Sequence, residues 1–441
     1  GIKKHPLSVR NFLRWARATY SVLPKNVFLI GHGVSYPQYR TNESNANADK
    51  LNLVPTFGNP ASDMLLSSTP TDPVPQTPIG RLSVVYGDEI KPYLDKVVEY
   101  EAAKAITSPL IKDKAWMKNV VHVVGGSDEK LGNMLADYMG KYKSIISDSL
   151  YGANVTTFNK TSVNPVEQLG SSLLPDLFQE GIGMLLYFGH SSATVLSFNL
   201  DNPQNYNNAG KYPVMIMLGC NAGNFFNYSV GRFSTKNTIS ESFILAPQRG
   251  SVAYFASTHL GIVHYLDIYN TRTYNSMART NYGKSIGEQI TEAIRQVYNL
   301  TTTEDYYARF HTEENTLHGD PAIKLSSYAK PDYVIEDPLV RVLPSFISVS
   351  KKKFQVNAKF LNIGKVVNDS IVVEVKRQYP GGVSEVVYHD KIPGIRYADS
   401  LSLVLPIIAT RDRGINKITV TIDAANSVDE LYETNNSITK E

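Results

Sequence analysis

Short segments built almost entirely of apolar residues recur along the first three quarters of this 441-residue chain. A strand that is apolar on both sides must be buried on both faces, as in the mostly parallel sheets of α/β proteins. Helical stretches and glycine-containing turns separate the segments, which cover residues 27–30, 119–124, 184–188, 214–218 and 252–255. We therefore expect an α/β domain over residues 1–326, with a mostly parallel sheet flanked by helices.

Other stretches of this region complete the pattern. Apolar side chains at helical spacing predict helices over residues 8–23, 88–105 and from 129 through 138, and residues 79–84 are expected to form a further short strand. The chain begins at Gly1 without the layout of a signal peptide, so we expect a piece of a longer protein, truncated at its N-terminus.

The pattern of apolar and polar residues changes near residue 327. Residues 327–336 lose periodicity and are expected to be a linker. Apolar and polar residues then alternate, with turn residues between the runs, over 354–360, 370–376, 401–405 and 416–422. This pattern predicts a β-sandwich over residues 337–441, and the absence of a cysteine pair excludes an antibody-type domain.

Composition excludes several classes of function. Lys and Arg number 44 against 41 Asp and Glu, a net charge of +3, so no broad basic field is available for nucleic acid. No apolar run reaches the roughly 18–20 residues that span a bilayer, so we expect no transmembrane segment. The single cysteine, Cys220, excludes an internal disulfide and any metal site built from several thiolates.

That cysteine and one histidine follow two of the predicted strands. His190 comes after the strand at 184–188 and Cys220 after the strand at 214–218, each preceded by a glycine. Sites in parallel sheets form at the carboxyl ends of strands. If the two strands are neighbours, the pair has the arrangement of a thiol nucleophile and its base, which suffices for acyl transfer. The structural alternatives are that Cys220 is a small buried apolar residue and that His190 has only a structural role.

A carboxylate that orients His190 would complete the arrangement. Glu129 is our choice, with Asp128 beside it, because both follow the strand at 119–124, whose carboxyl end is expected at the same rim. The alternative is that both acids simply stabilise the start of the next helix, with Ser127 as its N-cap. His259, after the strand at 252–255, is expected to line a substrate cleft, with a structural role as the alternative. A zinc site is disfavoured because His259 and His264 have no third ligand in view.

Two motifs carry a resemblance to a known family. They are YFGHSS at 187–192 and MLGCNAGNF at 217–225, and shorter fragments agree in order at 28–31, 54–56, 62–63, 79–82, 96–101, 240–243, 250–253 and 317–321. The region resembles the gingipain-type cysteine peptidases, whose catalytic domain is caspase-like. The tail, through residues 362–364 and 423–436, is similar to the immunoglobulin-like adhesion modules of bacterial surface proteins.

The resemblance implies Cys220 as nucleophile and His190 as general acid and base of a cysteine endopeptidase. The backbone around the pair, at Gly189, Ser191, Gly219 and Asn221, is expected to line the oxyanion site. Ser191 stands where the family usually has glycine, and the basic P1 specificity of the best-known members is not carried over.

The resemblance further implies an extracytoplasmic setting of the Bacteroidetes type, secreted or associated with the outer membrane and cell surface. The family includes sortase-like transpeptidases of the type IX secretion system. Transfer of the acyl group to an amine, in place of hydrolysis, is therefore a variant of the same hypothesis. No cofactor is required, although structural calcium occurs in the family. Ser62 and Asp63 are therefore candidates for binding calcium or lining the site. The alternative is that they form an Asx turn.

A rival hypothesis comes from a different functional class. The altered loop after His190 would then mark a catalytically inactive caspase-like platform in a cell-surface or secretion complex, with other surface proteins as partners. The first hypothesis instead expects a protein or peptide substrate.

Overall fold

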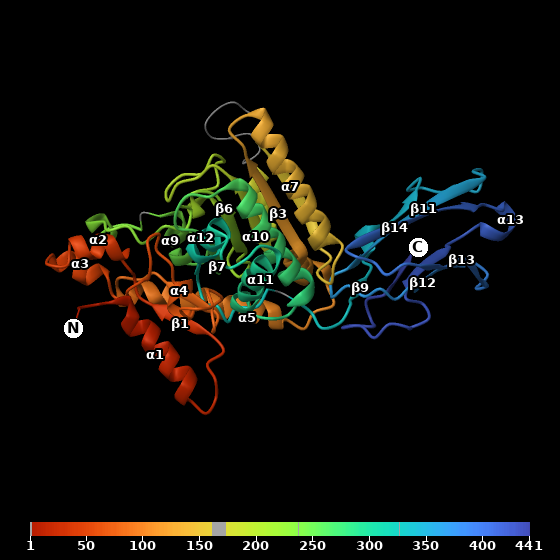
Figure 1. Ribbon diagram of the computed structural model, residues 1–441. Coiled ribbons are helices and arrows are strands. Elements are labelled where there is room, and N and C mark those ends of the chain that lie inside the picture. The colour runs from red at the N-terminus through yellow and green to blue at the C-terminus, as the bar shows by residue number, and fades with distance from the viewer. Residues whose placement is uncertain (1, 161–172, 237, 326) are drawn as a thin grey trace. The chain divides into compact units, whose positions relative to one another are not determined.

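The computed structural model describes residues 2–441 except 161–172, 237 and 326, and the chain divides into two compact units (Figure 1). The first consists of residues 1–105, 119–145 and 155–326. The second consists of residues 106–118, 146–154 and 327–441. Two segments from within the range expected for the first domain are thus grouped with the second unit.

The first unit is built on an eight-stranded sheet with the order β1-β2-β8-β7-β6-β5-β3-β4. Its strands are β1 (Val27–Ile30), β2 (Ile79–Leu82), β3 (Asn119–Gly125), β4 (Asn154–Asn159), β5 (Met184–Gly189), β6 (Val214–Leu218), β7 (Ala253–Ser257) and β8 (Asn315–His318). The neighbours β3, β5, β6 and β7 are parallel, whereas β8 is antiparallel to β7 and parallel to β2. The carboxyl ends of β3, β5, β6 and β7 therefore share one edge with the amino end of β8.

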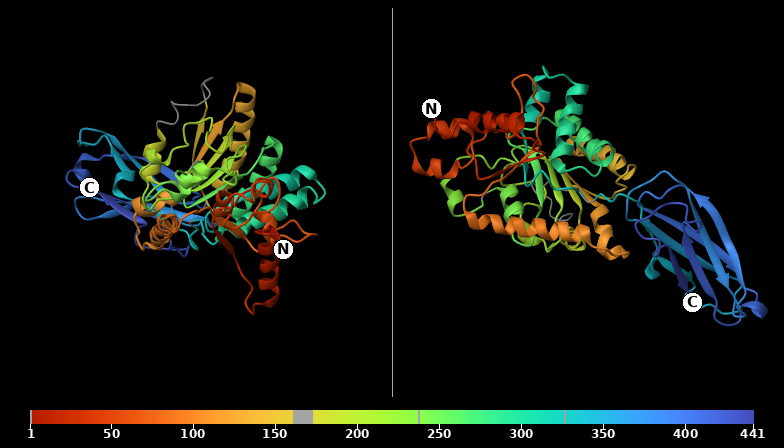
Figure 2. Two further views of the ribbon diagram at one scale, coloured as in Figure 1. Left: turned by 90° about the vertical axis from the view of Figure 1, so that its left-hand side faces the viewer. Right: turned by 90° about the horizontal axis from the view of Figure 1, so that it is seen from below.

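Helices cover both faces of this sheet, as Figure 2 shows. The helices of this unit are α1 (Pro6–Thr19), α2 (Tyr36–Thr41), α3 (Ala46–Leu51), α4 (Met64–Ser67), α5 (Ile90–Ala105), α7 (Glu129–Ser147), α8 (Leu174–Glu180), α9 (Ile239–Leu245), α10 (Val263–Asn275), α11 (Ile286–Leu300) and α12 (Tyr306–Glu314). The predicted mostly parallel, helix-flanked sheet is confirmed.

Alternation along the strands explains the two covered faces. On one face, Leu185 and Tyr187 join a buried cluster with Phe178 of α8 and Phe243 of α9. On the other, the Phe188 ring stacks on Tyr138 of α7, with 6.1 Å between ring centroids. Successive side chains of a strand point to opposite faces, so a strand between two helical layers is apolar throughout.

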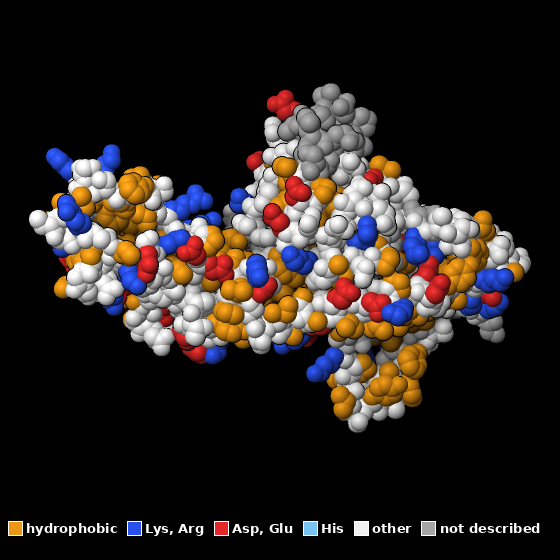
Figure 3. All heavy atoms as spheres, turned by 180° about the vertical axis from the view of Figure 1, so that it is seen from behind, with side chains coloured by type: hydrophobic (Ala, Val, Ile, Leu, Met, Phe, Trp, Pro, Cys, Tyr) orange, Lys and Arg blue, Asp and Glu red, His pale blue; other side chains and the backbone are white. Residues whose placement is uncertain are grey.

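Apolar side chains gather on the outer side of α1 and the residues that follow it. Phe12 is 53% exposed and Trp15 is 51% exposed, and the projection at the bottom of Figure 3 carries this patch. Arg10 and Arg14 instead point inward, and both donate to the carbonyl oxygen of Ser68.

The second unit contains two four-stranded antiparallel sheets that form a β-sandwich. One has β9 (Tyr333–Val334), β10 (Val340–Leu343), β11 (Lys353–Asn362) and β14 (Ala398–Pro406), and the other has β12 (Ile371–Gln378), β13 (Ser384–Ile392), β15 (Lys417–Ile422) and β16 (Ser437–Lys440). The short helices α6 (Ile111–Lys114) and α13 (Ala409–Asp412) also belong to this unit.

The interior of the sandwich is formed by the alternating residues of its strands, including Val356, Val373 and Val420. Residues 327–336, expected as a linker, contain β9, which pairs with β11 and buries Tyr333 completely. The side chain of Lys118, from one of the two inserted segments, donates to the carbonyl oxygens of Asn362 and Gly364, each at 2.8 Å. Residues 327–336 therefore include part of the sandwich and are not a free connector.

Candidate active site

The loops that carry His190 and Cys220 leave neighbouring strands at the same edge of the sheet. Strands β5 and β6 are paired in parallel, and Phe188 lies opposite Leu218. His190 and Cys220 each stand two residues beyond this pair. The expectation that these two strands are neighbours is confirmed. Their pairing places the two loops side by side.

Close packing between these loops requires glycine. A Cβ atom on Gly219 would lie 2.1 Å from Ser191 Oγ and 2.6 Å from the carbonyl oxygen of Gly189, far inside contact distance. A Cβ on Gly189 would meet the backbone of Gly125 at 2.5 Å. From the sequence, the backbone at these glycines is expected to line the oxyanion site. The structure shows that they first allow three strand ends to approach one another.

The thiol of Cys220 is half-buried and receives a backbone hydrogen bond. The N–H of Gly261 donates to Sγ over 3.3 Å. The Ser191 hydroxyl donates to the carbonyl oxygen of Cys220 at 2.9 Å and so joins the two loops. A backbone N–H aimed at sulfur stabilises a thiolate, which is the form of cysteine that attacks a carbonyl carbon.

The backbone donors near the thiol differ in their availability. The N–H of Asn221 donates to the carbonyl oxygen of His259 at 2.6 Å, so this donor is occupied, contrary to the sequence expectation. Asn221 itself has a φ of 56°, a left-handed conformation that turns the chain sharply after the thiol. Within the described parts of the chain, the N–H groups of Ser191 and Cys220 have no acceptor, which leaves them free for an oxyanion.

The backbone of the His190 loop is firmly held, while its ring is exposed at the rim. The N–H of His190 donates to the carbonyl oxygen of Gly125 at 3.2 Å. Its own carbonyl oxygen accepts from the hydroxyls of Tyr187 and Ser197 and from the N–H of Ser197. A held loop with an exposed imidazole suits proton transfer to and from a bound substrate.

The two candidate carboxylates occupy different positions. Asp128 caps α7, because its Oδ1 accepts from the N–H of Leu131 at 3.0 Å while the Ser127 hydroxyl donates to its Oδ2 at 2.9 Å. These hydrogen bonds hold the pKa of Asp128 below its usual value, and the positive charge of His190 lowers it further. Glu129 is exposed at the first position of α7. The charge interaction with His190 therefore belongs to Asp128, and the N-cap is Asp128 rather than Ser127.

We expect Asp128→Asn to lower turnover about three- to tenfold, the effect of one charge interaction at an exposed site. Asparagine is an equally good helix cap, so the melting temperature should stay unchanged. Peptide hydrolysis measured as kcat/KM and thermal unfolding followed by circular dichroism check these two expectations. A larger loss in Glu129→Gln than in Asp128→Asn would restore Glu129 as the orienting residue.

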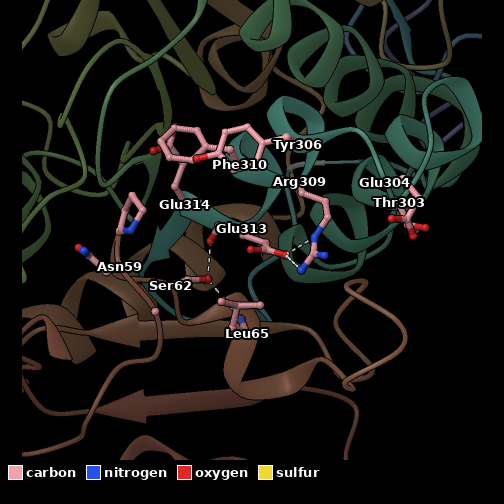
Figure 4. A pocket seen from close by; sticks show the side chains of 12 residues that line it. Asn59, Ser62, Leu65, Thr303, Glu304, Tyr306, Arg309, Phe310, Glu313 and Glu314 are labelled. Carbon is pink, nitrogen blue, oxygen red and sulfur yellow. Dashed lines mark hydrogen bonds and ion pairs between the residues drawn. The ribbon is translucent and has the colours of Figure 1, made fainter. Parts of the chain in front are cut away.

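His259 lies beside the thiol loop. Its carbonyl oxygen accepts from Asn221, and its exposed ring meets Phe310 edge to face with 5.9 Å between centroids. Beyond Phe310 lies a pocket that involves Glu314 and the segment at residues 58–65 (Figure 4). Neither Gly261 nor Glu314 was predicted from the sequence, because a backbone donor and a helix-end acid carry no distinguishing pattern.

The remaining candidates have structural partners. Asp63 forms a buried bidentate ion pair with Arg81 and accepts from the Thr56 hydroxyl. Across the described residues, no three His, Cys, Asp or Glu side chains converge as a metal site. Nor does any described helix have the length and apolar character needed to cross a membrane.

Comparison with known proteins gives a consistent picture. A family model described as Peptidase family C25 matches residues 2–326, and no curated protein matches the sequence. The solved structure of the Arg-specific cysteine proteinase gingipain R (RGPB) is similar over 99% of this chain and 87% of its own, with 15% identity and a TM-score of 0.54. The complex of the Porphyromonas gingivalis RgpB pro- and mature domains is similar over 99% and 89%, with 16% identity and a TM-score of 0.53. At these identities the structural likeness shows the fold.

Proposed function

The chain belongs to peptidase family C25 and is a cysteine peptidase, and from this premise we propose that it is an endopeptidase with Cys220 as nucleophile and His190 as acid and base. The observation that carries this assignment is the placement of the two residues on adjacent loops of neighbouring parallel strands. The hydrogen bond from Gly261 N–H to Sγ adds to it, because it holds the sulfur in place at the end of β6.

In the first half of the reaction, the Cys220 thiolate adds to the carbonyl carbon of the scissile peptide bond. The N–H groups of Ser191 and Cys220 are free to hold the oxyanion that forms. As the intermediate collapses, the C–N bond breaks and the His190 imidazolium gives its proton to the departing amine. The product of this step is a thioester between the substrate's acyl group and Cys220.

In the second half, a nucleophile resolves the thioester. Water attacks the acyl carbon, His190 accepts its proton, and the carbon–sulfur bond breaks to release a carboxylic acid and the thiolate. An amine could attack in the same way and form a new peptide bond, which is the sortase-like variant. We place the substrates among extracytoplasmic proteins, following the family resemblance of residues 187–192 and 217–225.

The test is a peptide library that presents every residue type at P1, incubated with the protein and analysed by mass spectrometry. Wild type should cleave a subset of the peptides, and Cys220→Ala should cleave none. Adding an excess of an amine-bearing peptide separates hydrolysis from transfer, because transfer yields a joined product. A folded wild-type protein that cleaves no peptide would overturn the proposal in favour of a caspase-like binding platform.

A further inference from the structure

A pocket of about 390 Å³ lies between α12 and the segment at residues 58–65, which ends in the first turn of α4, outside the loops that carry His190 and Cys220. Figure 4 shows that Arg309 and Glu313 lie between Glu314 on one side and Glu304 on the other. The aromatic rings of Tyr306 and Phe310 stack at 6.1 Å and form part of the lining.

The buried carboxyl group of Glu314 is the unusual feature of this pocket. The residue is 2% exposed, and neither of its carboxyl oxygens has a hydrogen-bond partner within the described residues. Burial raises its pKa to about 9. Buried polar groups are almost always satisfied, so an orphaned carboxyl in a pocket lining points to a ligand that supplies the missing partner.

The position of Glu314 is set by its backbone. It is the last residue of α12, and its carbonyl oxygen accepts from the N–H of Thr258 at 3.1 Å. Asn315, the first residue of β8, donates from its side chain to the carbonyl oxygen of His311. The helix end is thus held against the end of β7, with Glu314 among the residues that line the pocket.

The charges around Glu314 favour a cationic ligand. Arg309 is already engaged by Glu313, with contacts of 2.8 and 3.0 Å to one carboxylate oxygen. Glu304 adds a further exposed negative charge to the lining. The faces of Tyr306 and Phe310 can pack against an aliphatic stem or attract a cation by its contact with the ring. Lysine and arginine side chains combine these properties.

The pocket is linked to the thiol loop through Phe310 and His259. The Phe310 ring contacts the ring of His259, whose carbonyl oxygen in turn accepts from Asn221, the residue after Cys220. A side chain attached directly to the attacked carbonyl would first meet the loops of His190 and Cys220. A pocket on the other side of Phe310 and His259 instead suits a residue that flanks P1.

We propose that this pocket binds a positively charged side chain of the substrate at a position other than P1, with Glu314 as its counter-ion. The inference rests on the proposed endopeptidase function. When the cation enters, the Glu314 carboxyl gives up its proton to solvent and an ion pair forms. The alternative ligand is a neutral amide side chain, which would pair with the protonated carboxyl and release no proton.

The kinetic test uses peptides that share one P1 residue and carry lysine, norleucine or glutamine at each flanking position in turn. At one position wild type should cleave the lysine peptide at least tenfold better than the norleucine peptide, measured as kcat/KM. Glu314→Gln should remove this preference while cleaving the norleucine peptide within about twofold of wild type. Glu101→Gln, an exposed acid of α5, is the matched control and should keep the preference.

A binding measurement keeps this test independent of catalysis. Titration calorimetry of Cys220→Ala with the lysine peptide, in two buffers of different ionisation enthalpy, should show proton release that disappears in Cys220→Ala/Glu314→Gln. If that double variant does not fold, Phe310→Leu in the Cys220→Ala background should weaken binding of the lysine peptide several-fold. Equal binding of lysine and norleucine peptides would overturn the proposal, as would tighter binding of glutamine without proton release. Absence of cleavage together with lysine-specific binding would reject only the endopeptidase function.

Discussion

Cys220→Ala is expected to lower kcat/KM for a cleaved peptide by roughly 10⁴-fold or more, because no other thiol in the chain can form the thioester. His190→Ala should cause a loss of the same order, because the leaving amine then departs without a proton donor. The two losses should not multiply in the double variant, since both residues serve one covalent step.

The matched control for the histidine is His389→Ala, which removes an exposed imidazole from β13 of the second unit. It should leave kcat/KM within twofold of wild type. Peptide hydrolysis by purified variants, checked for folding by circular dichroism, supplies the measurement. Full activity in Cys220→Ala would show that the thiol has no part in the chemistry.

The second large effect concerns stability. Arg81→Met is expected to reduce the free energy of unfolding of the first unit by about 3–5 kcal/mol, because it leaves the buried Asp63 carboxylate unpaired. Arg81 is fully buried, donates two hydrogen bonds of 2.7 Å to Asp63, and also holds the carbonyl oxygens of Gly31 and Val54. These contacts tie β1 and β2 to the loop that leads into α4.

Hydrogen exchange of the amides of β1 and β2 measures this change as a free energy of opening. Lys91→Met is the matched control, because the Lys91–Asp95 pair on α5 has the same charges but is largely exposed. It should cost less than about 1 kcal/mol. Equal effects of the two substitutions would show that the buried pair has no special place in the stability of the sheet.

The central strands could be predicted from the sequence because they are buried on both faces. Strands β3, β5, β6 and β7 lie between helical layers. Their nearly continuous apolar runs are typical of strands that are buried on both faces. Strand β8 was not predicted as a strand, since its four residues, Asn315–His318, mix polar and apolar types. Its antiparallel pairing with β7 depends on tertiary structure alone.

Burial also explains which strands of the sandwich were predicted and which were missed. Strands β11, β12 and β15 alternate because one face packs in the interior, and each was expected. Strand β13 was missed, because most of its side chains are exposed and no alternation marks it. Strand β9 has only two residues, too few for any pattern to show.

In the candidate site, the sequence predicted the elements but not the contacts. His190 and Cys220 stand out because rare residue types follow glycines at strand ends. The backbone donor of Gly261 and the orphaned carboxyl of Glu314 depend on how distant segments pack. Local sequence likewise could not decide between Asp128 and Glu129, because both can stand at the start of a helix.

The assignment of Cys220 as nucleophile and His190 as its base is tested most directly by covalent trapping with a peptidyl acyloxymethyl ketone that carries the best sequence from the library. The probe alkylates a thiol only when the peptide is bound and the nucleophile is activated, and mass spectrometry locates the adduct. We expect one adduct, on Cys220, that is absent in His190→Ala although iodoacetamide at high concentration still alkylates the unfolded variant. Labelling of Cys220 at an equal rate in wild type and His190→Ala would contradict it.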